Sequence, residues 1–359
     1  MTQRSPRPTR RARSRTVAVA TPLLAVALLA LTGALCRAQE EASDVEYALI
    51  KPLAVDSLLL DGAAAGELLV AVGERGHILH SRDRGASWTQ AQTVPTRALL
   101  TAVYLHDENL GWAVGHDATI LRTDDGGVTW DLQYSAPEEE LPLLDVWFED
   151  ADNGLAIGAY GYFLQTSDGG ANWSFADFDP SAGDGEEDEE LEEDPYAYDG
   201  GADFHLNHIS RSDSGALYIA AEAGSLYRSD DDRATWKTLP SPYEGSFFGS
   251  LPLEGDAVLL FGLRGHLFRS EDAGETWQAI ESGTQAILTD GIRLNDGTIV
   301  ICGLEGTLLV SRDAGRTFAL EAQADRQAFS ALLPQPDGGI ILFGEFGVTL
   351  LPASALGAS

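Results

Sequence analysis

The chain has 359 residues, of which 56 are acidic and 23 basic, and its formal net charge at pH 7 is −33. Seven of the basic residues precede residue 39, so the remainder of the chain is still more acidic. Such a surface repels nucleic acid and anionic lipid headgroups, and it favours basic proteins or cations as partners.

Residues 1–38 have the pattern of an export signal. Six arginines between Arg4 and Arg15 precede an apolar run from Val17 to Leu31, and Ala38 offers a cleavage point before Gln39. The run is short for a spanning helix, which needs roughly 20 apolar residues. We therefore expect an exported protein, periplasmic or associated with the periplasmic side of a membrane; an uncleaved anchor is the alternative.

The rest of the chain repeats one unit, whose clearest copy is GWAVGHDATILRTDDGGVTW at residues 111–130. The glycine or alanine that closes the second strand recurs at Gly73, Gly115, Gly158, Ala221, Gly262, Gly303 and Gly344. A period near 42 residues that holds about four short strands is typical of one propeller blade. The sequence thus predicts an all-β, seven-bladed propeller of four-stranded blades over residues 39–351, with a tail at 352–359.

The four strands of a unit are expected to follow one another in chain order from the axis of the ring outward. In the second unit they lie at residues 99–105, 111–115 and 119–123, with the fourth starting at Trp130. The seventh unit supplies three strands before the chain ends. We expect residues 45–50, VEYALI, to add the fourth strand and so to latch the ring, because closure removes an exposed sheet edge.

A motif of the form S/T-x-D-x-G-x-T-W ends six of the units and resembles the Asp-box. The carboxylate of such a box can accept hydrogen bonds from backbone N–H groups in a tight turn, and the following aromatic residue can wedge against the neighbouring sheet. The role is structural, and neither catalysis nor metal binding is expected. The box aspartates are Asp83, Asp125, Asp168, Asp231, Asp272 and Asp313.

The turns between second and third strands should emerge together on the face opposite the Asp-boxes. Their residues mix charged, aromatic and aliphatic side chains, which is typical of a surface for another protein; for any single residue a solvated turn tip is the simpler interpretation. The candidate partner-binding residues are Glu74, Arg75, His116, Asp117, Tyr160, Arg264, Glu305 and Phe346.

One insertion, at residues 174–203, separates the third and fourth units. Nine of the eleven residues from Asp184 to Asp194 are acidic, so the segment cannot bury enough apolar surface to fold alone. A solvated spacer and a recognition arm for a basic partner are both possible, the latter helped by Tyr196, Tyr198 and Phe204. The arm comprises Asp184, Glu186, Glu187, Asp188, Glu189 and Glu190.

Together, the signal, the repeats and the pattern A-V-G-x-x-G-x-I-L-x-T-x-D-G-G-x-T-W resemble the photosystem II stability/assembly factor family. The strongest points lie at residues 111–130 and 154–173. The resemblance implies a seven-bladed propeller, without a catalytic centre, cofactor or metal, that binds newly made membrane-protein subunits. We therefore expect a non-enzymatic, monomeric scaffold whose partner is a protein client, a membrane protein of the envelope.

Two features depart from that family. Members that serve photosystem II carry an arginine-rich patch, whereas the arginines here are expected to be scattered, and the acidic insertion is not part of the shared pattern. These departures point to a client other than a photosynthetic one.

A glycoside hydrolase of the sialidase type is the competing hypothesis, because those enzymes share Asp-boxes. No Arg-Ile-Pro segment occurs, and only Arg75, Arg97 and Arg264 are expected to reach the open face. Glu74 with Asp117 could in principle form the carboxylate pair of a propeller glucanase. A third hypothesis is a propeller that binds cations through its acidic arm.

Overall fold

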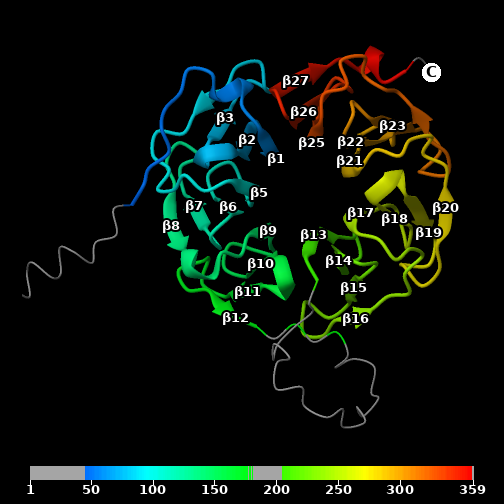
Figure 1. Ribbon diagram of the computed structural model, residues 1–359, viewed down its shortest axis with the longest axis horizontal. Helices are drawn as coiled ribbons and strands as arrows, with labels where there is room; N and C mark the ends of the chain where they lie inside the picture. The colour runs from blue at the N-terminus through cyan, green and yellow to red at the C-terminus, as the bar shows by residue number, and fades with distance from the viewer. Residues whose placement is uncertain (1–44, 177, 179, 181–203, 358–359) are drawn as a thin grey trace, which may run out of the picture. The chain divides into compact units, whose positions relative to one another are not determined.

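The computed structural model describes residues 45–176, 178, 180 and 204–357. Seven antiparallel sheets follow one another around a ring (Figure 1). Within each sheet the strands lie side by side in chain order. The predicted all-β, seven-bladed propeller is confirmed.

The strands predicted for the second unit agree with those of blade 2 to within one residue. Blade 1 contains β1 (Leu59–Ala65), β2 (Leu68–Gly73), β3 (Ile78–Ser81) and β4 (Thr89–Gln90). Blade 2 contains β5 (Leu100–Leu105), β6 (Gly111–Gly115), β7 (Ile120–Thr123) and β8 (Asp131–Tyr134). Blade 3 contains β9 (Leu143–Phe148), β10 (Gly154–Gly158), β11 (Phe163–Thr166) and β12 (Ser174–Phe175).

The remaining blades repeat this plan, except that the last has three strands. Blade 4 contains β13 (Leu206–Arg211), β14 (Leu217–Ala221), β15 (Leu226–Ser229) and β16 (Lys237–Thr238). Blade 5 contains β17 (Phe247–Pro252), β18 (Val258–Gly262), β19 (Leu267–Ser270) and β20 (Gln278–Ile280). Blade 6 contains β21 (Leu288–Arg293), β22 (Ile299–Gly303), β23 (Leu308–Ser311) and β24 (Ala319–Leu320), and blade 7 contains β25 (Phe329–Pro334), β26 (Ile340–Gly344) and β27 (Gly347–Leu351).

Seven apolar clusters hold the ring together, one at each junction between neighbouring blades. The second strands are buried along their whole length because a neighbour covers each of their faces. Blades 7 and 1 close the ring in the same way, with Phe343 and Ile341 packed against Leu69 and Leu79. The aromatic residue that ends each Asp-box packs into the junction with the preceding blade, as predicted; Trp130, for example, joins the cluster between blades 1 and 2.

The predicted latch at residues 45–50 is wrong. These residues form no strand, and blade 7 has only β25, β26 and β27. The segment instead runs beside blade 1, where the Ala48 N–H donates to the Val94 carbonyl (2.9 Å) and the Gln90 side chain donates to the Leu49 carbonyl (3.0 Å). Only the following 3-10 turn, η1 (Ala54–Asp56), packs against blade 7, through Ala54 and Val55. Closure therefore depends on apolar packing, without a shared fourth strand.

All the helices in the described part of the chain are short 3-10 turns, and none of them is long and apolar enough to cross a membrane. The tail after β27 makes one such turn, η6 (Ala353–Ala355). Beyond it Leu356 is buried in the cluster between blades 6 and 7, and the Arg312 side chain donates to its carbonyl (3.0 Å).

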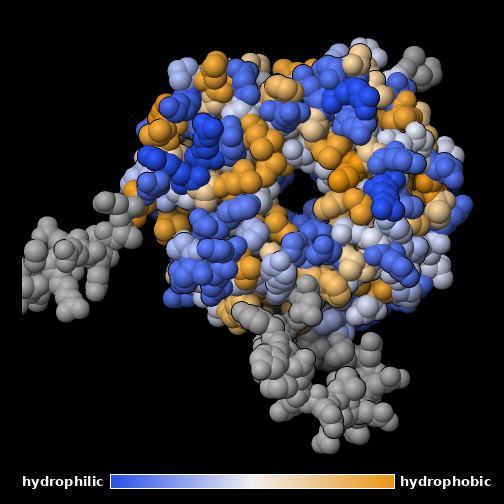
Figure 2. Space-filling model, viewed as in Figure 1, coloured by the Kyte–Doolittle hydropathy of each residue, from blue (hydrophilic) through white to orange (hydrophobic). Residues whose placement is uncertain are grey.

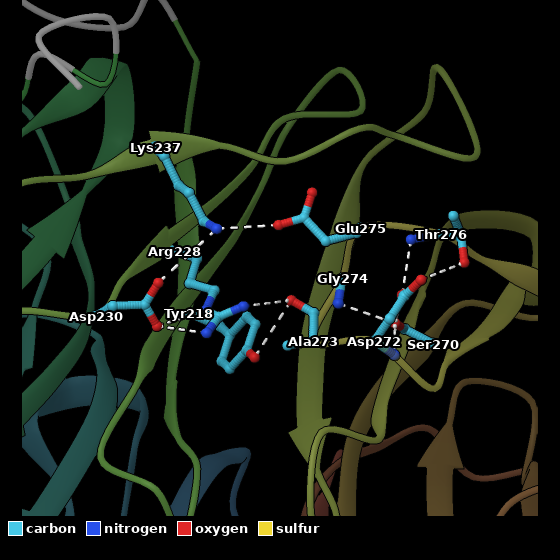
Figure 3. Close-up of polar contacts among 10 residues, drawn as sticks. All are labelled: Tyr218, Arg228, Asp230, Lys237, Ser270, Asp272, Ala273, Gly274, Glu275 and Thr276. Carbon is cyan, nitrogen blue, oxygen red and sulfur yellow. Dashed lines mark hydrogen bonds and ion pairs between the residues drawn. The ribbon is translucent and has the colours of Figure 1, made fainter. Parts of the chain in front are cut away.

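The Asp-boxes form closed hydrogen-bond networks, as shown for blade 5 in Figure 3. The Asp272 carboxylate accepts hydrogen bonds from the Ser270 hydroxyl (2.8 Å), the Thr276 N–H (2.8 Å) and the Thr276 hydroxyl (2.6 Å). The other five boxes repeat these contacts; in blade 3 the Asn172 amide replaces the threonine hydroxyl, and in blade 4 Arg233 adopts the φ of 73° that glycine adopts elsewhere. The carboxylates are thus occupied by their own turns, which is the predicted structural role.

The Asp-box turns of blades 5 and 6 are also held by an arginine of the preceding blade. The Ala273 carbonyl of blade 5 accepts hydrogen bonds from the Arg228 side chain (3.1 Å) and the Tyr218 hydroxyl (3.4 Å) of blade 4 (Figure 3). Arg269 of blade 5 binds the Ala314 carbonyl of blade 6 in the same way (3.0 Å). The two arginines stand on third strands, β15 and β19, and add polar contacts to the apolar junction.

A chain that begins at Lys51 tests how the ring is closed. It loses three hydrogen bonds and the exposed ion pair between Arg97 and Glu46, so we expect the free energy of unfolding to fall by only about 1 to 2 kcal/mol. A chain that begins at Leu58 also loses buried Ala54 and should be clearly less stable. Denaturant unfolding of both chains, compared with a chain that begins at Gln39, checks this expectation. An equally large loss of stability in the chain that begins at Lys51 would contradict it.

Replacing Arg228 with methionine tests the contact between blades 4 and 5. The side chain is largely buried, and its loss leaves the Ala273 carbonyl with the longer Tyr218 bond. We expect a loss of about 1 to 2 kcal/mol, because hydrogen bonds from charged groups contribute about that much. Arg264→Met, at an exposed turn, is the matched control and should change stability by less than about 0.5 kcal/mol.

Candidate functional site

The ring presents two different faces. On one, the turns between second and third strands lie beside the connections to the next blade; the Gly76 N–H, for example, donates to the Ala98 carbonyl (2.9 Å). On the other, the Asp-box turns lie beside the turns between first and second strands, as with the Gly126 N–H and the Asn109 carbonyl (2.9 Å). We call these the turn face and the Asp-box face.

The turn face collects the residues predicted to bind a partner. Arg75, Asp117, Tyr160, Arg264 and Glu305 all occupy the middle of their turns with φ between 51° and 59°, a left-handed conformation that directs the side chain outward. The residue that follows in the turn is usually glycine, because the backbone of the next connection lies close to it. A Cβ on Gly76, for example, would lie 2.3 Å from the Thr96 carbonyl oxygen. The structure thus places the candidates on one face at six separate tips, with Phe346 on blade 7 (56 % exposed).

Two of these tips are already paired by charge. The Arg75 guanidinium lies 3.7 Å from Glu74 of its own turn, and Arg326 pairs with Glu305. Glu74 and Asp117, the carboxylates considered for glycoside hydrolysis, belong to different blades, and Glu74 is engaged by arginine. They stand on separate tips, Glu74 after β2 and Asp117 after β6.

The acidic arm residues Asp184 and 186–190 lie outside the described residues. The structure does describe where the chain leaves blade 3 and enters blade 4. Phe175 is exposed at the first point, and Phe204 and His205 lie at the second, where the Phe204 carbonyl accepts a hydrogen bond from the Gly161 N–H (3.0 Å). The insertion is therefore attached to the turn face.

A channel runs through the centre of the ring and opens in Figure 2 between the blades. Three aspartates, one from each of β1, β9 and β21, line it, together with His208 of β13. Each carboxylate joins two blades by accepting a backbone N–H from the next blade. The pairs are Asp61 with Val103 (2.8 Å), Asp145 with Ile209 (2.7 Å) and Asp290 with Leu332 (3.0 Å).

Burial raises the pKa of all three channel carboxyls, and repulsion from Asp290 and Asp145 adds to the effect at Asp61. The sequence does not single out these three aspartates, because the repeat is recognised by its second strand and its Asp-box, whereas the aspartates lie on first strands. Their hydrogen bonds indicate a structural role. No group of three or more histidine, cysteine or acidic side chains in the described part of the chain is placed to hold a metal ion.

The expectation of scattered arginines is wrong. Arg269, Arg293, Arg312 and Arg316 line one hollow of about 640 Å³ on the Asp-box face, between blades 5 and 6. Arg269 is only 6 % exposed and pairs with Glu271, while Arg293 lies 3.7 Å from Glu254. Arg269 comes from blade 5 and the other three arginines from blade 6. They meet at the junction between these two blades, together with Glu254, Glu271 and Asp296.

The two sets of aspartates predict opposite effects of pH on stability. Hydrogen bonds from Ser87, then from Ser81, lower the pKa of Asp83 to about 2, and the pKa of the other five box carboxyls is also lowered. Box stabilisation is therefore present above the unfolded pKa near 4 and lost as the pH falls towards 2. The raised pKa of the channel carboxyls means that their ionisation opposes folding, so stability rises as the pH falls below their folded pKa.

We thus expect a stability maximum at mildly acidic pH, a little above 4, in denaturant unfolding measured from pH 8 to pH 2. Asp61→Asn should flatten the limb between neutral pH and the maximum, because the variant lacks the buried charge. Asp272→Asn should instead flatten the acid limb. Stability that rises steadily to pH 8 in the parent chain would contradict the assignment of the channel carboxyls.

Solved structures similar to the protein include two YCF48 proteins. The structure described as YCF48 bound to D1 peptide is 18 % identical, with a TM-score of 0.65, and the match covers 86 % of this chain and 96 % of the other. YCF48 from Cyanidioschyzon merolae is 15 % identical, with a TM-score of 0.63 and coverage of 86 % and 98 %. A GH74 xyloglucanase from Xanthomonas campestris is 13 % identical, with a TM-score of 0.62 and coverage of 88 % and 54 %. At these identities the likeness shows the fold alone.

A comparison with curated proteins finds no match. The family model described as photosynthesis system II assembly factor YCF48 matches residues 86–180 and 134–301, which together make up more than half of the chain. The matched ranges include the Asp-boxes of blades 2 to 5 and the turns between them. The chain therefore belongs to the family of the photosystem II assembly factor YCF48.

Proposed function

We propose that the protein is an exported, non-catalytic scaffold that binds a membrane-protein client, or an assembly intermediate, through its turn face. Membership in the YCF48 family is the observation that carries this proposal. A structurally similar YCF48 is described bound to a D1 peptide, which supports a protein as the client here. The N-terminal pattern of residues 1–38 supports export, with the protein acting as a monomer in the periplasm or on the periplasmic side of a membrane.

The turn face suits this role because several of its side chains are exposed and take no part in holding the ring. The Asp-box carboxylates and the outer arginines are occupied by contacts that hold the ring, whereas tips such as Tyr160, Arg264 and Phe346 extend into solvent. Exposed aromatic and arginine side chains are the types enriched in protein interfaces. The acidic insertion leaves from the same face and would extend the contact surface.

The glycoside hydrolase hypothesis has weaker support. Catalysis of that type needs two carboxyl groups about 5 to 9.5 Å apart across a substrate. Glu74 and Asp117 stand on separate tips, and the likeness to the xyloglucanase is one of fold.

Co-purification tests the proposal. The tagged protein is recovered from detergent-solubilised membranes, beside a chain without residues 181–199, a turn-face variant (Tyr160→Ser with Phe346→Ser) and an Asp-box-face variant (Arg293→Ser with Arg316→Ser). We expect a membrane protein to be recovered with the parent and the Asp-box-face variant, and recovery to fall at least about tenfold with the turn-face variant, a loss that two interface anchors can cause.

The arm deletion should reduce recovery if residues 181–199 belong to the contact. Loss of the client only in the Asp-box-face variant would place the contact at the arginine-lined hollow instead. Recovery of no membrane protein by any of the four chains would contradict the scaffold function.

A further inference from the structure

One sector of the turn face, around the tip of blade 3, combines exposed aromatic rings. Tyr160 is 63 % exposed, and the edge of its ring meets the ring of His205, with centroids 4.9 Å apart and planes at 78°. Phe204 lies beside the same turn and is 38 % exposed. The rings come from two blades, so the sector crosses the junction between blades 3 and 4.

A second aromatic group lies on the other side of the blade 3 turn. Phe175, 58 % exposed, meets the ring of Tyr162 edge-on at 5.0 Å between centroids. The Tyr162 hydroxyl lies 3.0 Å from the Tyr134 hydroxyl of blade 2. We call the surface formed by Tyr134, Tyr160, Phe175, Phe204 and His205 the aromatic sector.

Carboxylates surround the aromatic sector. Glu222 lies 3.8 Å from the His205 ring, and Glu139 is close enough to raise the pKa of Tyr162, after burial and the Tyr134 hydroxyl. The connection that carries Glu138, Glu139 and Glu140 is tied to the blade 3 turn by the hydrogen bond from the Ala159 N–H to the Pro142 carbonyl (3.0 Å).

Arginine and lysine do not occur among the described residues of this sector, which comprise 116–119, 134–145, 159–163, 175–176 and 204–207, together with the facing turn 221–226. The cationic side chains of the turn face stand elsewhere, on blades 1, 5 and 6, where Arg75 and Arg326 are paired with glutamates. The sector therefore has unbalanced negative charge next to exposed aromatic faces.

The conformation of Tyr160 supports a role for its ring. Its φ of 51° is one that bulky side chains rarely adopt, and glycine would adopt it without strain. The ring covers no buried cluster, so packing of the core does not explain a tyrosine at this position.

We propose that the aromatic sector is the docking site for a cationic extended segment of the client, with a lysine or arginine side chain over the face of Tyr160 and Glu222 beside it. Cations bind over tyrosine rings, and nearby carboxylates strengthen the attraction. This inference rests on the proposed function, since it names the chemistry of the client segment. Charge complementarity excludes an acidic segment at the same place.

Direct binding tests the inference without the client. The probe is a fluorescein-labelled peptide of Arg-Leu-Ser repeats, with Glu-Leu-Ser repeats for comparison, and the readout is fluorescence anisotropy. Measurement at roughly 0.15 M salt limits attraction from charges beyond about 8 Å. The protein variants are Tyr160→Ser, Tyr160→Phe and Glu222→Gln. Tyr47→Ser is the matched control, because Tyr47 is an exposed tyrosine (50 %) outside the proposed contact surface.

We expect the arginine peptide to bind and the glutamate peptide not to bind. Tyr160→Ser should weaken binding about tenfold, in line with a partly desolvated cation over an aromatic ring, while Tyr160→Phe keeps the ring and most of the affinity. Glu222→Gln should weaken it several-fold, and Tyr47→Ser should leave it within about twofold. Denaturant unfolding of each variant confirms that it is folded.

Equal weakening by Tyr160→Ser and Tyr47→Ser, or no effect of Tyr160→Ser, would overturn the inference, because the affinity would then not depend on the ring of Tyr160 in particular. The two proposals fail separately. If the peptide binds as expected but no membrane protein is co-purified, the inference about the aromatic sector is supported and the proposed scaffold function is contradicted. If the single variant Tyr160→Ser still recovers the client at the parent level, the function stands and the sector is not its docking site.

Discussion

The structure depends on the apolar junction between neighbouring blades. A four-stranded blade is too small to bury both faces of its second strand by itself, so each sheet is stable only between two others. Seven such junctions, including the one between Phe343 of blade 7 and Leu69 of blade 1, make the ring a closed unit. Because closure is made by side chains, the chain before residue 51 can lie along blade 1 and leave blade 7 with three strands.

The polar contacts divide the two faces between stability and recognition. On the Asp-box face, carboxylates such as Asp272 are saturated by their own turns, and Arg228 and Arg269 bind carbonyls of the next blade. On the turn face, the backbone requires only a left-handed residue followed by a small one, and leaves the identity of the side chain open. Tyrosine, arginine, aspartate and glutamate all occur at this position in one ring. Substitutions at this turn position do not alter the apolar junctions between the blades.

The repeat carries most of the information about the fold. A period near 42 residues, β-branched runs and the S/T-x-D-x-G motif predict the blades, the box contacts and the packing of Trp130, because each depends on local spacing. The position of residues 45–50 could not be predicted in this way, since an apolar alternating segment fits the edge of blade 1 as well as that of blade 7. The hollow around Arg269 and Arg316 and the meeting of Tyr160 with His205 depend on contacts between blades, which no single repeat contains.

Family membership and the charge of this chain constrain different parts of the function. The family model covers the blades and their Asp-boxes, and so it accounts for the scaffold. The side chains that would select a client stand on tips that the scaffold does not specify, and in this chain they are aromatic and acidic around blade 3, with an arginine-lined hollow on the opposite face. Electrostatic complementarity acts mainly on which partner is accepted. Because Glu254, Glu271 and Asp296 offset most of the charge of the arginines in the hollow, charge selects a client mainly at the aromatic sector around blade 3.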